Sequence, residues 1–306
     1  MARLARVKVE DGGAYYHLCG RTAGPIGEYP LADKKTRRKI VDFIRLFAKV
    51  YCCEVLGFCV MGNHYHLVVR MDAPRKMTRK ELRERAEVLY DERVLDGWLA
   101  AAWERFEKRI FDVSELMRSL QSKIARWYNA AHERRGRFWA DRFKSVLLED
   151  EKAVFDCLLY VELNPVRAGI VERPEAYDGS SVYYREVRDD KWMAPITTVT
   201  GRSRRAEALR DYKSCIYYRG SVPTKDGQGA IRKRLLAEEA SRGFAAEGLF
   251  TKRIRHFTEG VVIGSEEYIQ KKLERLRETG QYLRRRNPVP QLDGAHMTLR
   301  PQRSGG

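Results

Sequence analysis

Two histidines separated by a single residue could together hold a metal ion. They are His64 and His66, and the turn-forming pair Gly62-Asn63 precedes them directly. The residues that follow have the composition of a β-strand, in which alternate side chains share a face, so both imidazoles are expected on one side. Two neighbouring imidazoles can bind one divalent ion. The same triplet also occurs among structural histidines, so a metal site requires a third ligand elsewhere in the chain.

A tyrosine and an asparagine four residues apart could complete such a site. The spacing of apolar residues predicts a helix over 151–163, and Tyr160 and Asn164 then lie on one face, one turn apart. Pro165 disfavours helical geometry at Asn164, so we expect the helix to end there. A lone tyrosine on a helix more often serves packing, and Tyr160 by itself establishes no activity.

Cationic and aromatic residues alternate in a tract between these two groups, over residues 134–144. Arginines bind phosphates, and exposed aromatic rings stack on unpaired bases. The alternative is that the rings face the core while the cations face water, and both arrangements can hold at once. The residues of this tract that we assign to DNA contact are Arg137, Phe138, Trp139, Arg142 and Lys144.

The net charge of the chain indicates a polyanionic partner. Its 306 residues include 59 Lys and Arg against 42 Asp and Glu, a formal net charge of +17. An excess of this size favours nucleic acid or an anionic membrane surface. No stretch approaches the about 20 apolar residues that a membrane span needs, and the N-terminus lacks the apolar core of a signal peptide. We therefore expect nucleic acid and no membrane.

The six cysteines indicate the compartment. None belongs to a CxxC pair, and most lie inside apolar runs, where cysteine behaves as a small hydrophobic residue. We expect no disulfides, no zinc cluster and a reducing, cytoplasmic setting.

Sequence periodicity predicts the elements that must position these residues. Extended structure is expected over 3–20, a helix after a capping Asp33, and a hairpin made of 53–60 and 64–71. Farther along, Ser114 is expected to cap a long amphipathic helix, and a further strand is expected before the helix that carries the tyrosine.

The chain divides into three regions. Residues 1–185 are expected to form one domain, interrupted at about 73–112 by a charged insertion typical of solvated helix. Residues 186–283 are expected to form a basic, mainly helical C-terminal extension. The tail 284–306 contains prolines and a terminal Gly-Gly and is expected to be flexible.

The candidate residues together suit phosphoryl chemistry. Two imidazoles and one oxygen ligand suit Mg²⁺ or Mn²⁺ and leave positions for water and phosphate oxygens. Tyrosine is a weak nucleophile at neutral pH because its reference pKa is about 10, and a metal that polarises the scissile phosphate lowers the barrier. Attack by a tyrosine would give a covalent phosphotyrosine that conserves the bond energy, so rejoining needs no ATP.

The sequence resembles a known family at these same residues. His64-Tyr65-His66 resembles the HUH motif of single-strand DNA nucleases. Residues 160–169 closely resemble the Tyr-x-x-x-Asn-Pro-Val-Arg-Ala-Gly signature of the REP-associated tyrosine transposases. Shorter matches are Arg142-Phe143-Lys144-Ser145, Tyr16-His17 and Arg21-Thr22. The resemblance covers roughly residues 3–185.

The resemblance implies an α+β fold, with a ferredoxin-like catalytic domain whose antiparallel sheet is flanked by helices. It also implies that His64 and His66 bind the metal, that Asn164 is the third ligand, and that Tyr160 forms a 5′-phosphotyrosine. Two further cations in the matched motifs, Arg21 and Arg167, join the residues assigned to DNA contact.

The implied substrate is single-stranded DNA folded into short imperfect hairpins, as in repetitive extragenic palindromes (REPs). A monomer is favoured, although insertion-sequence relatives pair two subunits, which keeps a dimer open. Two alternatives stay open as well: a Rep- or relaxase-like enzyme that nicks an origin, and a hairpin-binding regulator with a silent site. The single obvious tyrosine argues against the first, and the complete set of candidate site residues argues against the second.

Overall fold

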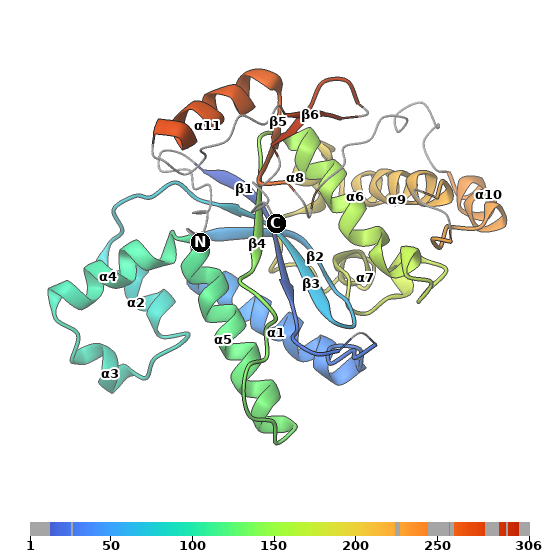
Figure 1. The fold of residues 1–306 in the computed structure, drawn as a ribbon. Coiled ribbons are helices and arrows are strands. Elements are labelled where there is room, and N and C mark those ends of the chain that lie inside the picture. Colours follow the sequence, from blue (N-terminus) through green and yellow to red (C-terminus); the bar gives the residue numbers. More distant parts are fainter. Residues whose placement is uncertain are drawn as a thin grey trace.

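A seven-stranded sheet carries the fold, with the strand order β2-β3-β1-β4-β5-β7-β6 (Figure 1). The computed structural model describes residues 13–25, 27–223, 227–243, 257, 260–278, 288–291 and 293–299. The first four strands are β1 (Ala14–Arg21), β2 (Cys53–Val60), β3 (His64–Met71) and β4 (Lys144–Leu148). Residues 3–12 of the predicted extended segment lie outside the described residues.

The first half of the chain has ferredoxin-like topology, as predicted. Helix α1 (Lys34–Val50) follows β1, and helix α5 (Val113–Ala131) precedes β4, which gives the order β1-α1-β2-β3-α5-β4. Strand β1 pairs antiparallel with both β3 and β4, and β2 pairs antiparallel with β3. This βαββαβ order with two central strands from opposite halves defines the ferredoxin-like arrangement.

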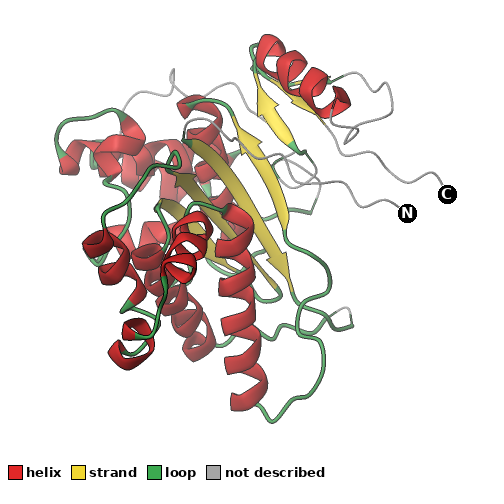
Figure 2. Cartoon of the chain, turned by 90° about the vertical axis from the view of Figure 1, so that its left-hand side faces the viewer, coloured by secondary structure: helices red, strands yellow, loops and turns green. Residues whose placement is uncertain are grey.

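The two faces of this sheet bury different cores. Leu18, Tyr65 and Leu67 lie in the core formed with α1 and α5, whereas Val68 and Val146 lie in the core formed with α6 (Glu151–Arg167). Alternation along each strand produces this separation. Figure 2 shows helices in front of the strands and behind them. The helix that carries Tyr160 therefore covers a different face from α1 and α5.

Acidic side chains set the first turns of α1 and α5. Asp33 caps α1 as predicted, because its carboxylate accepts a hydrogen bond from Thr36 N at 2.9 Å. The predicted cap of the second helix was wrong. Asp112 is the cap and accepts from Ser114 N at 2.6 Å, which leaves Ser114 inside the first turn. A carboxylate there both satisfies the backbone N–H groups and complements the helix dipole.

Helix α6 runs through Pro165 to Arg167, so its predicted end at Asn164 was wrong. A proline removes the N–H that would bond to the carbonyl four residues earlier, here that of Val161. The side-chain amide of Asn164 compensates for this loss, because its Nδ2 lies 3.3 Å from Val161 O and 2.9 Å from Tyr160 O. The side chain of Asn164 thus replaces the backbone hydrogen bond that Pro165 cannot make.

The insertion at about 73–112 is helical, as predicted, but it is not merely a solvated surface. Its helices are α2 (Arg79–Ala86), α3 (Glu92–Asp96) and α4 (Ala100–Ile110). Leu82, Leu95 and Phe106 are buried in the same core as α1 and α5. These contacts anchor the insertion to the domain that it interrupts.

The C-terminal region is helical only in part. The helices that follow α6 are η1 (Pro174–Ala176) and α7 (Ser181–Glu186), and then α8 (Ile196–Thr200), α9 (Arg205–Ser221), α10 (Lys233–Ser241) and α11 (Glu266–Glu278) of the C-terminal extension. The strands that follow α6 are β5 (Val262–Gly264) in the extension, and β6 (Val289–Pro290) and β7 (Met297–Leu299) beyond residue 284. No helix among the described residues is long and apolar enough to cross a membrane.

These three late strands extend the ferredoxin-like sheet beyond β4. Strand β5 pairs parallel with β4, and Leu147 N donates to Val261 O at 2.9 Å. Strands β7 and β6 then add antiparallel pairs. The flexible tail predicted from residue 284 is therefore wrong for 288–291 and 293–299. An edge strand exposes unpaired backbone groups, and β5 satisfies those of β4.

His296 fastens the turn before β7 to the start of α6. Its Nε2 lies 2.9 Å from Asp150 Oδ2, and its Nδ1 lies 2.5 Å from Asp293 Oδ2. Asp150 is also the cap of α6. Burial lowers the pKa of His296, but the hydrogen bonds to Asp150 and Asp293 outweigh burial and raise that pKa above 6.5.

We expect this contact to make stability depend on pH. A histidine whose pKa is raised by folding contributes fully below its unfolded pKa of about 6.5, and its contribution is lost as pH rises through the folded pKa. Urea unfolding of the wild type should show a fall in free energy above about pH 6.5, and His296→Gln should lack that fall and be about 2 kcal/mol less stable at about pH 5.5. Parallel pH profiles for the two proteins would contradict the assignment.

Candidate active site on the histidine face

The strand register brings the two predicted histidines together with β1. His64 pairs with Arg21 and His66 pairs with Cys19. Because paired residues of an antiparallel sheet point to the same side, His17, Cys19 and Arg21 line one face with both histidines. The ring centroids of His64 and His66 are 5.0 Å apart. The two imidazoles thus share a face as predicted, and it is the face that α6 covers.

Tyr160 projects from α6 onto this histidine face. Its ring lies edge-on to His66, with 5.6 Å between ring centroids, and edge-on to His17 at 6.1 Å. The ring of Phe257 packs against it at 5.5 Å. Tyr160 and the histidines, which are about a hundred residues apart in the sequence, are therefore neighbours in space.

A glycine lets α6 approach the sheet closely enough for this contact. At Gly57 of β2 a Cβ atom would lie 2.5 Å from Leu158 Cδ2 and 2.9 Å from Ser181 Oγ. Atoms this close cannot coexist, so a larger residue at position 57 would require the side chains of Leu158 and Ser181 to shift. The β-bulge between Val55 and Gly57 lies at the same place.

His17 was not among the predicted site residues, although the Tyr16-His17 match marked it. Its Nε2 lies 3.0 Å from His66 Nδ1, and the two rings stack with centroids 5.1 Å apart. Its Nδ1 lies 2.7 Å from the backbone oxygen of Phe257. The available sequence signal was a histidine inside an otherwise apolar strand, but its partners depend on pairings that sequence spacing does not reveal.

All three histidines are held neutral near pH 7. Burial lowers the pKa of His17 to about 4 and that of His64 to about 4. Burial, together with the two neighbouring imidazoles, places the pKa of His66 well below 6.5. A neutral imidazole is the form that binds a metal ion, because protonation would occupy the ligand nitrogen.

The donor atoms of this face fit a divalent cation. His66 Nε2 is buried without a hydrogen-bond partner in the described structure, a costly arrangement for a polar atom unless a ligand fills it. His64 Nδ1 lies 2.8 Å from Asn63 Oδ1, which leaves the other ring nitrogen for a ligand. Among the described residues no group of three His, Cys, Asp or Glu side chains could hold a metal ion. A third protein ligand drawn from the described residues would therefore be of another type.

The side-chain amide of Asn164 can offer a metal only its oxygen, Oδ1. Its Nδ2 donates to Tyr160 O and Val161 O, which orients the amide and leaves Oδ1 as its acceptor. The contact ties the amide to the same helix turn that carries Tyr160. Asn164 is half-buried.

Four of the predicted DNA contacts lie exposed around the end of the sheet that carries His64, and we call them the basic rim: Arg21, Arg137, Arg142 and Lys144. Lys144 pairs with Cys19, two residues before Arg21. Ala140 N donates to Arg21 O at 2.9 Å, so the loop that carries the other two arginines is pinned to the end of β1.

The other three predicted DNA contacts are engaged in the fold. Phe138 is 2% exposed and packs on Tyr128, so it cannot stack on a base here and that assignment was wrong. Trp139 is half-buried, and its indole N–H donates to Gln121 O at 2.9 Å. Arg167 donates to three backbone carbonyls at the ends of α9 and its loops, those of Arg219, Val222 and Gly229. Arg167 therefore serves the fold, and its assignment to DNA stays a prediction.

A groove at the start of α1 was missed by the sequence analysis. This α1 groove has a volume of about 520 Å³ and is lined by Lys34, Lys35, Arg38, Lys39, Asp42 and Trp127. Among the described residues no ion pair neutralises its four cations. Leu31 N donates to Gly62 O at 2.8 Å, so the start of α1 lies beside the turn that leads into His64. The sequence showed these cations only as the polar face of a helix.

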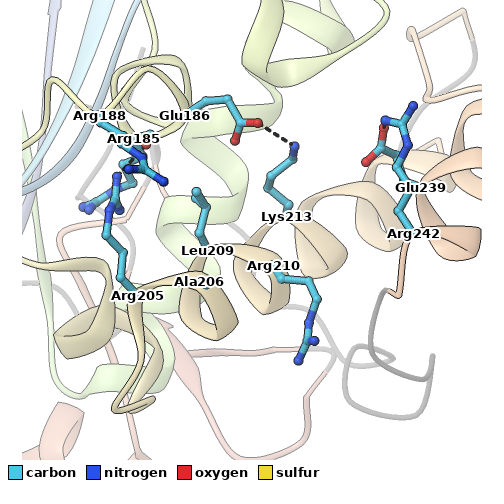
Figure 3. Close-up of a pocket in the computed structure, with 10 residues that line it drawn as sticks. All are labelled: Arg185, Glu186, Arg188, Arg205, Ala206, Leu209, Arg210, Lys213, Glu239 and Arg242. Atoms are coloured by element: carbon cyan, nitrogen blue, oxygen red, sulfur yellow. Dashed lines mark hydrogen bonds and ion pairs between the residues drawn. The ribbon is translucent and has the colours of Figure 1, made fainter.

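A second cavity, of about 550 Å³, lies among α7, α9 and α10 (Figure 3). Most of its cations already lie beside carboxylates. Lys213 lies 3.4 Å from Glu186, Arg205 lies 3.2 Å from Asp190, and Arg242 contacts Glu239. Because the charges cancel locally, this cavity is a poor anion site, and none of the candidate site residues lines it.

Similarity to known proteins lies among solved structures. No protein-family model matches the chain, and no curated protein matches it. A solved REP-associated tyrosine transposase bound to a REP hairpin is similar with a TM-score of 0.39 and 13% sequence identity, over 62% of this chain and 87% of that one. At this TM-score and identity the similarity decides neither family nor function, which must be inferred from the site.

Proposed function

We propose that the protein is a metal-dependent single-strand DNA endonuclease and strand transferase of the REP-associated tyrosine transposase type, acting on REP-like hairpins. The observation that carries this proposal is the Tyr160 ring set edge-on to His66, 5.6 Å away, on a ferredoxin-like sheet. His66 there presents a buried, unpartnered nitrogen beside His64. A nucleophile beside a cation site is the minimum that phosphodiester transfer requires.

Each residue has a defined role in this reaction. His64, His66 and Oδ1 of Asn164 would hold Mg²⁺ or Mn²⁺, which when bound polarises the scissile phosphate and neutralises its charge. Tyr160 Oη attacks phosphorus, the bond from phosphorus to the 3′ oxygen breaks, and the phenol proton passes through solvent to that oxygen. The products are a free 3′ hydroxyl and a 5′-phosphotyrosine. Attack by another 3′ hydroxyl reverses the step and joins strands.

DNA would approach along the basic rim at the end of the sheet that carries His64 and extend to the α1 groove on the face covered by α1 and α5. The rim follows the ends of β1 and β4, and the groove begins beside the turn before β3. Unneutralised cations bind phosphates by releasing counterions. The half-buried Trp127 adds an aromatic face to the groove.

Removing two cations of the α1 groove is expected to weaken hairpin binding. Lys35→Ala with Arg38→Ala should raise the dissociation constant roughly 10-fold and reduce the slope of log affinity against log salt by about 2. The matched control is Arg232→Ala with Arg234→Ala, since both of these exposed arginines already pair with Glu172. Fluorescence anisotropy over a salt series measures both pairs, and equal losses would remove the groove as a DNA surface.

The function is tested by looking for the covalent intermediate. Labelled single-stranded DNA bearing the repeats that flank the gene is incubated with the protein and Mg²⁺ or Mn²⁺, then separated on a denaturing gel. We expect a protein–DNA adduct that EDTA abolishes, with the DNA attached to the peptide that contains Tyr160. Tight binding without adduct or cleavage under either metal would favour the silent regulator. An adduct formed only on origin-type DNA that lacks hairpins would favour the Rep- or relaxase-like enzyme that nicks an origin.

The site also bears on assembly and compartment. Tyr160 and the histidines meet within one chain, so we propose that a monomer suffices, and light scattering during the reaction tests this. The six cysteines are free thiols, which suits the reducing cytoplasm that we propose as its location.

A further inference from the structure

Three groups form a continuous chain of hydrogen bonds that ends at the buried nitrogen of His66. The backbone oxygen of Phe257 lies 2.7 Å from His17 Nδ1, and His17 Nε2 lies 3.0 Å from His66 Nδ1. His17 and His66 are each 1% exposed, and Phe257 is 4% exposed. The chain is therefore shielded from water over its whole length.

The chemistry of these groups fixes the direction of each bond. A backbone carbonyl can only accept, so His17 must carry its proton on Nδ1. A neutral imidazole has one N–H, which makes His17 Nε2 an acceptor. His66 must then donate from Nδ1, so the single N–H of the neutral His66 ring is on Nδ1. The remaining nitrogen of His66, Nε2, is left with a bare lone pair, and this is the buried atom that has no partner in the described structure.

We propose that His17, oriented by the Phe257 carbonyl, is the positioning residue that fixes the tautomer of His66 and presents its Nε2 lone pair to the divalent cation. This inference rests on the proposed function for the identity of the ligand. The carbonyl of Phe257, in the C-terminal region, then contributes to the metal site indirectly, by orienting His17. Metal-bound histidines commonly hold a partner on the second ring nitrogen, and losing that partner lowers metal affinity about 10–100-fold.

Two substitutions at one position separate this role from simple packing. His17→Leu fills the space but can neither donate nor accept. His17→Gln places a side-chain oxygen that can still accept from His66 Nδ1. The matched control is His132→Leu, because His132 also stacks on a ring, that of Tyr128 at 4.0 Å, but lies outside the site.

The test is nitrogen NMR of the metal-free protein labelled at histidine, followed by titration with Mn²⁺ alone. In the wild type we expect His17 and His66 both protonated on Nδ1. His17→Leu should lose the single tautomer of His66 and bind Mn²⁺ about 10–100-fold more weakly, whereas His17→Gln and His132→Leu should stay within about 3-fold.

Protonation of His66 on Nε2 in the wild type would overturn the proposal, as would an unchanged tautomer and Mn²⁺ affinity in His17→Leu. The spectrum of the wild type decides the tautomer even if a variant fails to fold. Failure of the proposed function looks different: the tautomers are as expected, but no covalent DNA adduct forms.

Discussion

Tyr160→Phe is expected to abolish the covalent DNA adduct and to lower strand cleavage at least about 10³-fold. The substitution removes one hydroxyl and keeps the ring that packs against His66 and Phe257. Hairpin affinity and the unfolding free energy should therefore remain close to the wild type. Denaturing gels measure the first effect, and anisotropy and urea unfolding measure the others.

The control for this substitution is Tyr29→Phe. Tyr29 is 60% exposed and lies against Gly62 at the end of the sheet that carries His64. The Tyr29→Phe substitution therefore also removes one hydroxyl near the site. We expect full adduct formation from this variant. An adduct retained by Tyr160→Phe would show that a different residue attacks the phosphate.

Arg185→Met is expected to cause the largest loss of stability, about 3–5 kcal/mol. Arg185 is 1% exposed and donates to Leu56 O at 2.8 Å and to Ala194 O at 3.1 Å, with Asp190 at 3.6 Å. Methionine keeps most of the volume but leaves two carbonyls without this donor. A buried polar group that loses its partner bears its full desolvation cost.

Two further variants refine the interpretation. Arg185→Lys should recover only part of the lost free energy, because an ammonium cannot match the planar fork that reaches both carbonyls. The exposed Arg188→Met should change stability by less than about 0.5 kcal/mol. Urea unfolding measures all of them, and an Arg185→Met protein within about 1 kcal/mol of the wild type would show that the buried guanidinium is dispensable.

Local patterns in the sequence predicted the ferredoxin-like half well. The cap at Asp33 and the hairpin of 53–60 with 64–71 depend on neighbouring residues, and the structure has both. The shared face of His64 and His66 follows from strand alternation alone. Such features need no knowledge of distant contacts, because the strand period is fixed by backbone geometry.

The features that the sequence analysis missed depend on long-range contacts. The role of His17 depends on the pairing of β1 with β3 and on the hydrogen bond from its ring to the Phe257 carbonyl. Strands β6 and β7 have two and three residues, which is too short for an alternating pattern to mark them. The continuation of α6 past Pro165 depends on the side-chain amide of Asn164, which donates to the Val161 carbonyl. Helix propensities do not include such a side-chain hydrogen bond.

The bond between His17 and Phe257 joins residues 240 positions apart, which orders events during synthesis of the chain. Tyr160 leaves the ribosome 97 residues before Phe257 (257 − 160 = 97). At about 5–20 residues per second, Tyr160 precedes Phe257 by about 5–20 s. Under the proposed function, a nascent chain would therefore carry its nucleophile before it carries the carbonyl that orients His17, and the cation site would be completed only after the nucleophile has emerged.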